Sequence, residues 1–113
     1  MAHHLSQLFN LWHNIIETTT EQMSKLNLAS DSKTPPETLT VLARDESFNV
    51  RCRVADNSNT PPETLTLLSQ DVDDIVRYWV ANNPNAPQEA LTILVQDENE
   101  GVRSLATQNP NYK

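Results

Sequence analysis

Apolar and polar residues follow one another along most of this chain in a pattern that recurs every 26 residues. The recurring units cover residues 34–59, 60–85 and 86–111 without gaps. The first two units are identical at fifteen of their twenty-six positions, and ten positions are the same in all three. A fixed period of this length is the signature of an array in which each unit packs against its neighbours.

Each unit begins with a short predicted helix. Residues 34–37 read Thr-Pro-Pro-Glu, which has the form of a capping box with proline at the first helical position, and residues 60–63 repeat it. The threonine oxygen is expected to accept a backbone N–H of the first turn. The helix ends near residues 43–44. Its apolar positions are Leu39, Val41 and Leu42, with Leu65, Leu67, Leu68 and Leu91, Ile93, Leu94 in the other units.

A second predicted helix follows in each unit. Asp45, Asp71 and Asp97 are expected to open it as N-caps. Its apolar stripe consists of Val50, Val54 and Ala55, with Val76, Val80, Ala81 and Val102, Leu105, Ala106 in the other units. The helix ends at Asn57, Asn83 and Asn109. Helices this short are not stable alone in water, so the sequence predicts an all-α solenoid of three two-helix repeats.

Residues 1–33 lie outside the repeat and are predicted to form one long helix and a polar joint to unit one. Apolar residues follow helical spacing over about 22 residues of this segment. They are Leu5, Leu8, Phe9, Trp12, Ile15, Ile16, Thr19, Met23 and Leu26. We interpret the helix as an N-terminal cap over unit one, because solenoids need their ends covered. The alternative is a partner-binding or dimerising helix. Residues 112–113 form a short tail.

The string TPPETL, then LxxD, then VRxxVAxNPN resembles the leucine-rich repeat variant family. It is also similar to HEAT-type repeats, in which an Asp and an Arg six residues later recur. The pairs here are Asp45/Arg51, Asp71/Arg77 and Asp97/Arg103. The resemblance covers residues 34–111 and implies a right-handed superhelix that mediates macromolecular interactions. A founding member of the family carries an iron–sulfur cluster on a group of cysteines. This chain has Cys52 alone, so no cofactor is carried over.

The charge and composition restrict the function further. The net charge of −7 repels a polyanion such as DNA unless a basic stripe overcomes it. No run of about 18 apolar residues is present, so no membrane span is expected. The first residues lack the pattern of a secretion signal, and the single cysteine fits a reducing compartment. We therefore expect a cytoplasmic protein.

Repetition also bears on the candidate chemistry. The Asp/Arg pairs recur in every unit, whereas a catalytic pair is needed once, so we interpret them as a structural ladder. Each Arg can reach the Asp of its own unit or of the next. His3, His4 and His13 lie at no metal-binding spacing, and no nucleophile motif is present. We expect neither a metal site nor an enzyme.

Positions that vary inside this constant pattern are the best candidates for partner contacts. They are Phe48, Arg53, Asp74, Tyr78, Trp79 and Glu100. Tyr78 and Arg53 are expected to be exposed because their polar ends need water or a partner. Trp79 is equally compatible with a place in the core.

Two functions remain open. The first is a non-catalytic protein–protein interaction module or small adaptor. The alternative is a nucleic-acid-related role, as a HEAT-like binder or as an acidic mimic of DNA. The anions of such a mimic would be Asp71, Asp73, Asp74, Asp97, Glu98 and Glu100.

A homodimer through the C-terminal repeat is also expected. Unit three is followed by no helix that would cover its apolar residues, and a two-fold end-to-end dimer is the simplest closed cover. These residues are Leu91, Ile93, Leu94, Val102 and Leu105.

Overall fold

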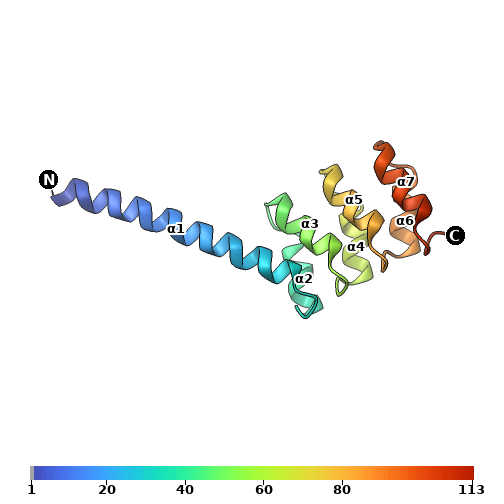
Figure 1. The fold of residues 1–113 in the computed structure, drawn as a ribbon, viewed down its shortest axis with the longest axis horizontal. Helices are drawn as coiled ribbons and strands as arrows, with labels where there is room; N and C mark the ends of the chain where they lie inside the picture. The colour runs from blue at the N-terminus through green and yellow to red at the C-terminus, as the bar shows by residue number, and fades with distance from the viewer. Residues whose placement is uncertain (1) are drawn as a thin grey trace.

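The computed structural model describes residues 2–113, with side chains from residue 6 onward. This part of the chain contains seven helices and no strand (Figure 1). The helices are α1 (Ala2–Ser30), α2 (Pro36–Leu42), α3 (Phe48–Asp56), α4 (Pro62–Leu68), α5 (Asp74–Asn82), α6 (Gln88–Leu94) and α7 (Glu100–Gln108). The predicted all-α solenoid of two-helix repeats is confirmed.

The helices of the repeats form two rows with the core between them. The second helices α3, α5 and α7 lie side by side in one row, and α2, α4 and α6 follow one another in the other (Figure 1). Leu39, Leu65 and Leu91 occupy one repeat position and have no exposed surface. The core is therefore built from the same apolar positions three times over, and each pair of short helices is held by its neighbours.

The predicted capping box is wrong, because the threonines precede the N-cap by one residue. Pro35 and Pro61 are the N-caps of α2 and α4, and no side chain bonds to the first turn of either helix. The hydroxyls of Thr34 and Thr60 instead donate to the carbonyls of Leu28 and Val54, at 2.6 Å each. These carbonyls belong to the last turns of the preceding helices, where each also accepts the backbone N–H of the residue three positions later. The threonines thus tie each unit to the helix before it.

The predicted N-caps of the second helices are also wrong, by two residues. Asp73 and Asn99 are the caps of α5 and α7, and their side chains accept backbone N–H groups of the first turn. Ser47 holds the same place before α3 without a side-chain bond. Asp71 precedes its cap and accepts the N–H of Asp73 at 3.0 Å. A local turn of this kind resembles a cap in sequence, because both use an aspartate oxygen.

The last turns of α1 occupy the place of a second helix before unit one. Ala29 has no exposed surface, and Leu26 packs against the same core. The bond from Thr34 to Leu28 reproduces the bond from Thr60 to Val54, 26 residues later. The array therefore begins with a half unit inside α1, and this half unit is the part of the helix that covers α3.

The rest of α1 projects away from the repeats (Figure 1), and the chain measures 68 × 29 × 15 Å along its principal axes. The apolar face predicted for this helix is exposed, with 68% of Phe9 and 63% of Trp12 accessible. The other large apolar residues exposed on α1 are Leu8, Leu11, Ile15, Ile16, Met23 and Leu28. The side chain of Leu5 lies outside the described residues.

The end of unit three is less apolar than the sequence indicated. Leu91, Leu94 and Val102 have no exposed surface, so the expectation that they remain uncovered is wrong. Tyr112 packs against the core from the C-terminal tail. Among the five residues named for a C-terminal dimer, Ile93 alone is exposed. The dimer through this unit stays a prediction.

Candidate interaction surface and the ladders that support it

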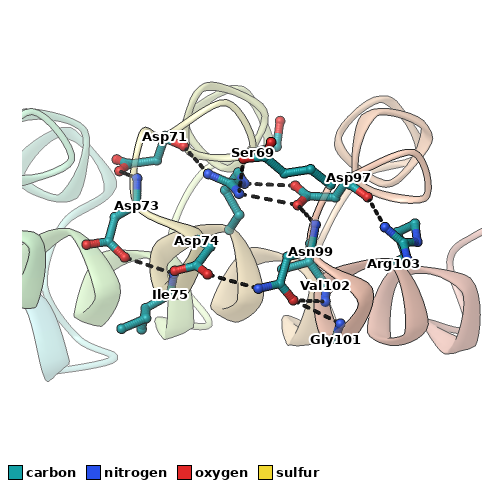
Figure 2. A network of polar contacts seen from close by, with 12 residues as sticks. Ser69, Asp71, Asp73, Asp74, Ile75, Asp97, Asn99, Gly101, Val102 and Arg103 are labelled. Carbon is teal, nitrogen blue, oxygen red and sulfur yellow. Dashed lines mark hydrogen bonds and ion pairs between the residues drawn. The ribbon is translucent and has the colours of Figure 1, made fainter.

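A ladder of arginines and aspartates joins successive units. The Nε of Arg51 donates to Asp71 of the next unit at 2.8 Å, and Arg77 donates to Asp97 at the same distance. The Nη1 of each arginine donates to the backbone carbonyl of the aspartate in its own unit, as Arg77 does to Asp71 at 2.8 Å. Figure 2 shows the same bond from Arg103 to Asp97. Each arginine therefore links its own backbone turn to the following carboxylate.

The two ends of this ladder differ. At the N-terminal end, Lys25 of α1 pairs with Asp45 at 3.1 Å, at the same 20-residue separation as Arg51 and Asp71. At the C-terminal end, Arg103 donates to the carbonyl of Asp97 at 2.6 Å. No carboxylate lies within ion-pair distance of Arg103 in the part of the chain that the structure describes. The half unit in α1 thus completes one end of the ladder.

The electrostatics of the ladder follow from its geometry. Burial on its own would raise the pKa of Asp97, but the hydrogen bond from Arg77 and the N–H of Asn99 outweigh it and hold the pKa below 3.8. Burial would also raise the pKa of Asp45, but the hydrogen bonds from the N–H of Ser47 and from Lys25 outweigh it and lower the pKa. The hydrogen bond to Asp97 raises the pKa of Arg77 above its ordinary value. The shifts arise from structural pairing and indicate no catalytic group.

A second ladder, of buried asparagines, was missed by the sequence analysis. The Nδ2 of Asn83 donates to the carbonyls of Ala55 and Asn57 in the preceding unit, at 2.7 and 3.2 Å. Its Oδ1 accepts the N–H of Asn85 at 2.8 Å. Asn57 and Asn109 make the corresponding bonds, and Asn57 donates to Ala29 and Asp31 of the half unit. The sequence does contain a signal for this ladder, because the residue at this position is asparagine in all three units. Helix termination alone does not require that identity.

These ladders hold the second helices so that one side of α3 and α5 is exposed, and we call this side the aromatic face. It consists of Phe48, Arg53, Ile75, Tyr78 and Trp79. Ile75 and Trp79 line two hollows, one of about 310 Å³ toward α7 and one of about 230 Å³ toward α3. The two side chains therefore form a ridge between neighbouring cavities.

Tyr78 and Trp79 occupy different environments on this face. Tyr78 is 41% exposed, whereas Trp79 is half-buried and packs against the core. Their rings meet edge to face, with centroids 5.5 Å apart. Trp79 therefore packs against the core and also lines the surface. The sequence had left open whether it was a core residue or a contact residue, and it occupies both places.

Charged groups border the aromatic face. Asp74 lines the larger hollow, and its Oδ2 accepts the Nδ2 of Asn99 at 2.9 Å (Figure 2). Arg53 and Asp56 line the smaller hollow. Glu100 lies apart, in a hollow beside Arg103 and Ser104. The structure therefore brings together five of the six predicted contact residues and leaves Glu100 outside the group.

The first helices carry an exposed apolar stripe in addition to their buried leucines. Val41, Leu67 and Ile93 occupy one repeat position and are exposed, Val41 by 72%. Val41 lies two residues from Leu39, so its side chain points about 200° away around the helix axis. Leu39 and Val41 therefore cannot share a face of α2.

The described side chains contain no group of three His, Cys, Asp or Glu residues that could hold a metal ion. Cys52 is buried, and this burial, together with the carboxylates of Asp73 and Asp71, raises the pKa of its thiol to about 11. The thiol is therefore protonated near neutral pH and is a poor nucleophile. In the described part of the chain, no helix combines the length and apolar character that crossing a membrane requires.

Comparison with known proteins identifies part of this array. Residues 48–73 and 76–99 match the family described as leucine rich repeat variant. Neither the curated proteins nor the solved structures compared with this chain gave a match.

Proposed function

Because residues 48–73 and 76–99 match the leucine rich repeat variant family, we propose that this chain is a non-catalytic interaction module that binds a protein segment on its aromatic face. The observation that carries the proposal is the larger hollow beside Ile75, Tyr78 and Trp79. Apart from Val102, its lining comes from positions that vary between units, whereas the ladders beneath it recur. We place the module in the cytoplasm, where the thiol of Cys52 stays reduced.

The chemistry of the face indicates the kind of segment that fits. Tyrosine and tryptophan are enriched among the residues that dominate binding energy, because they bury large areas and keep a polar group for hydrogen bonding. The carboxylates of Asp74 and Asp56 border the hollows, and the chain carries a net charge of −7. We therefore propose an apolar segment with basic residues at its edges.

The test is affinity capture with quantitative mass spectrometry, using the full chain and two variants. Tyr78→Ala removes an exposed aromatic ring, and Val72→Ala is the matched control because Val72 is 93% exposed and lines neither hollow. A protein captured by the wild type and by Val72→Ala should be reduced at least tenfold with Tyr78→Ala.

Salt separates this function from a nucleic-acid-related one. A complex held by the aromatic face should persist when salt is raised from 50 to about 500 mM. A complex with nucleic acid should weaken steeply over that range, because the protein competes with salt cations for the phosphates. Equal capture by the two variants, or a complex lost over that range, would contradict the proposal.

A further inference from the structure

The helix α1 carries apolar residues well beyond the part that is buried. Leu26 and Ala29 of this helix pack against the core. Leu8, Trp12 and Ile15 are spaced at intervals of four and three residues and form an exposed stripe, with Phe9 and Ile16 at its border. This spacing is one repeat of the seven-residue pattern by which helices pack lengthwise. The polar residues 17–22 separate the exposed stripe from the buried end of the helix.

We propose that the exposed stripe of α1 packs against the same stripe of a second copy of this chain, so that the protein dimerises through its N-terminal helix. We call this stripe the α1 stripe; it consists of Leu8, Phe9, Trp12, Ile15 and Ile16. The surface is separate from the aromatic face and does not depend on the function proposed for it.

The charge pattern of α1 favours a second copy over a lipid surface or a charged partner. Residues 6–20 contain one acidic residue, Glu17, and no lysine or arginine. Helices that lie on membranes usually carry lysine and arginine on their polar face, and this helix has none there. A strongly charged partner would meet no complementary charge. Two identical stripes with so few charges meet without like-charge repulsion.

The exposed area is sufficient for a specific dimer. Aromatic side chains bury about 150–250 Å² each, so the exposed parts of Phe9 and Trp12 offer about 250 Å² per copy. Leu8, Ile15 and Ile16 are each about half exposed and add a comparable area. Two copies would therefore bury about 1,000 Å², which reaches the lower limit for specific interfaces.

Helix stability supports the same conclusion. Most of the stability of a helix in a protein comes from the packing of its apolar face and not from the helix alone. Outside its last turns, α1 has the local contact between His13 Nε2 and a carboxylate oxygen of Glu17 at 3.1 Å, but no tertiary contact covers the α1 stripe. Packing against a second copy supplies the burial that this part of the helix lacks.

The test is sedimentation of the full chain between about 1 and 100 µM, alongside Trp12→Glu and the control Asn14→Glu. Trp12 lies in the stripe, and Asn14 lies about 200° around the helix on the polar face. The wild type and Asn14→Glu should dimerise, and Trp12→Glu should dimerise at least tenfold more weakly. Circular dichroism verifies that each variant keeps its helices.

Further measurements distinguish a second copy from the other molecules that could cover the α1 stripe. A wild type that stays monomeric throughout, or equal dimerisation of the two α1 variants, would overturn the proposal. A monomer that binds phosphatidylcholine vesicles through Trp12 would assign the stripe to lipid instead. If Ile93→Glu abolished the dimer and Trp12→Glu did not, the dimer would form through unit three. Tyr78→Ala should leave the dimer intact, which keeps this test independent of the proposed function.

Discussion

Asn83 is 1% exposed, and its side-chain amide forms hydrogen bonds with the backbone of two units. Its Nδ2 donates to two carbonyls of the preceding unit, and its Oδ1 accepts an N–H from the turn after α5. Buried backbone groups without a partner cost about 1–3 kcal/mol each. Asparagine at this position is therefore a bonding group between units as well as a helix terminator.

We expect Asn83→Ala to lower the free energy of unfolding by about 2–4 kcal/mol, because it leaves the carbonyl of Ala55 buried without a donor and removes the further bonds to Asn57 and Asn85. Asn82→Ala, at the exposed neighbouring position, should change it by less than about 0.5 kcal/mol. Urea denaturation of the two variants measures the difference. Similar losses for both would show that the asparagine ladder contributes little.

The pairing of Asp97 predicts how stability depends on pH. The pKa of Asp97 is held below 3.8 in the folded chain, so its contribution is complete above the unfolded value and is lost as pH falls through the folded value. The pKa of Asp45 is shifted in the same direction. The free energy of unfolding should therefore change little above about pH 5 and decrease below about pH 4.

The matching variant is Asp97→Asn, which removes one of these titrating groups. It should be less stable than the wild type at pH 7, and its stability should decrease less between about pH 5 and 2. Asp56→Asn, which alters an exposed carboxylate, is the control. A wild-type pH dependence in Asp97→Asn would mean that the ladder is not the acid-sensitive element.

At the scale of the helices, the half unit in α1 makes a prediction of its own. Ala29 lies without exposed surface where a second helix packs on α3. Ala29→Leu forces extra volume into that contact and should cost about 1–3 kcal/mol of unfolding free energy. Asn27→Leu, on the exposed side of the same turn, should be nearly neutral. Chemical denaturation checks both, and equal stability would mean that α1 is not part of the array.

The sequence predicted the helices well because their signals are local. Proline, asparagine and the apolar spacing mark where each short helix begins and ends, and those marks recur in every unit. The half unit was missed because Lys25 and Leu26 differ from their counterparts Arg51 and Cys52. Its equivalence lies in a bond to the backbone and in the pairing of Lys25 with Asp45, because few of its residues, such as Ala29, are identical to their counterparts in unit one.

The candidate surface was predicted in part for a similar reason. Variation within a constant pattern indicated Tyr78 and Trp79, and the structure brings them to one face. The exposure of Val41 could not be predicted, because the covered side of a seven-residue helix depends on its neighbours in space. Glu100 lies apart from this face because α7 carries its own hollow, beside Arg103 and Ser104.

At the scale of the whole molecule, the chain is a row of units in which each unit touches the next. Its radius of gyration is 17.8 Å, whereas a compact domain of this length has about 13 Å. Stability in such an array is a sum of unit terms and nearest-neighbour terms, so the ends can open without the middle. The pairing of Arg77 with Asp97 holds α5 to the next unit, and Arg103 of α7 has no such carboxylate in the described chain.

We therefore expect unit three to open before unit two. In native-state hydrogen exchange, the amides of residues 102–108 should exchange at least tenfold faster than those of residues 76–82, since α7 has a neighbouring unit on one side only. Leu94→Ala removes a fully buried side chain of α6 and should accelerate exchange in α6 and α7 while leaving α3 unchanged. Leu65→Ala leaves a cavity in the middle unit and should accelerate amide exchange in the units on both sides of it. If Leu94→Ala instead accelerated exchange equally in α3, α5 and α7, the three units would unfold as one cooperative block, and the nearest-neighbour description would fail for this chain.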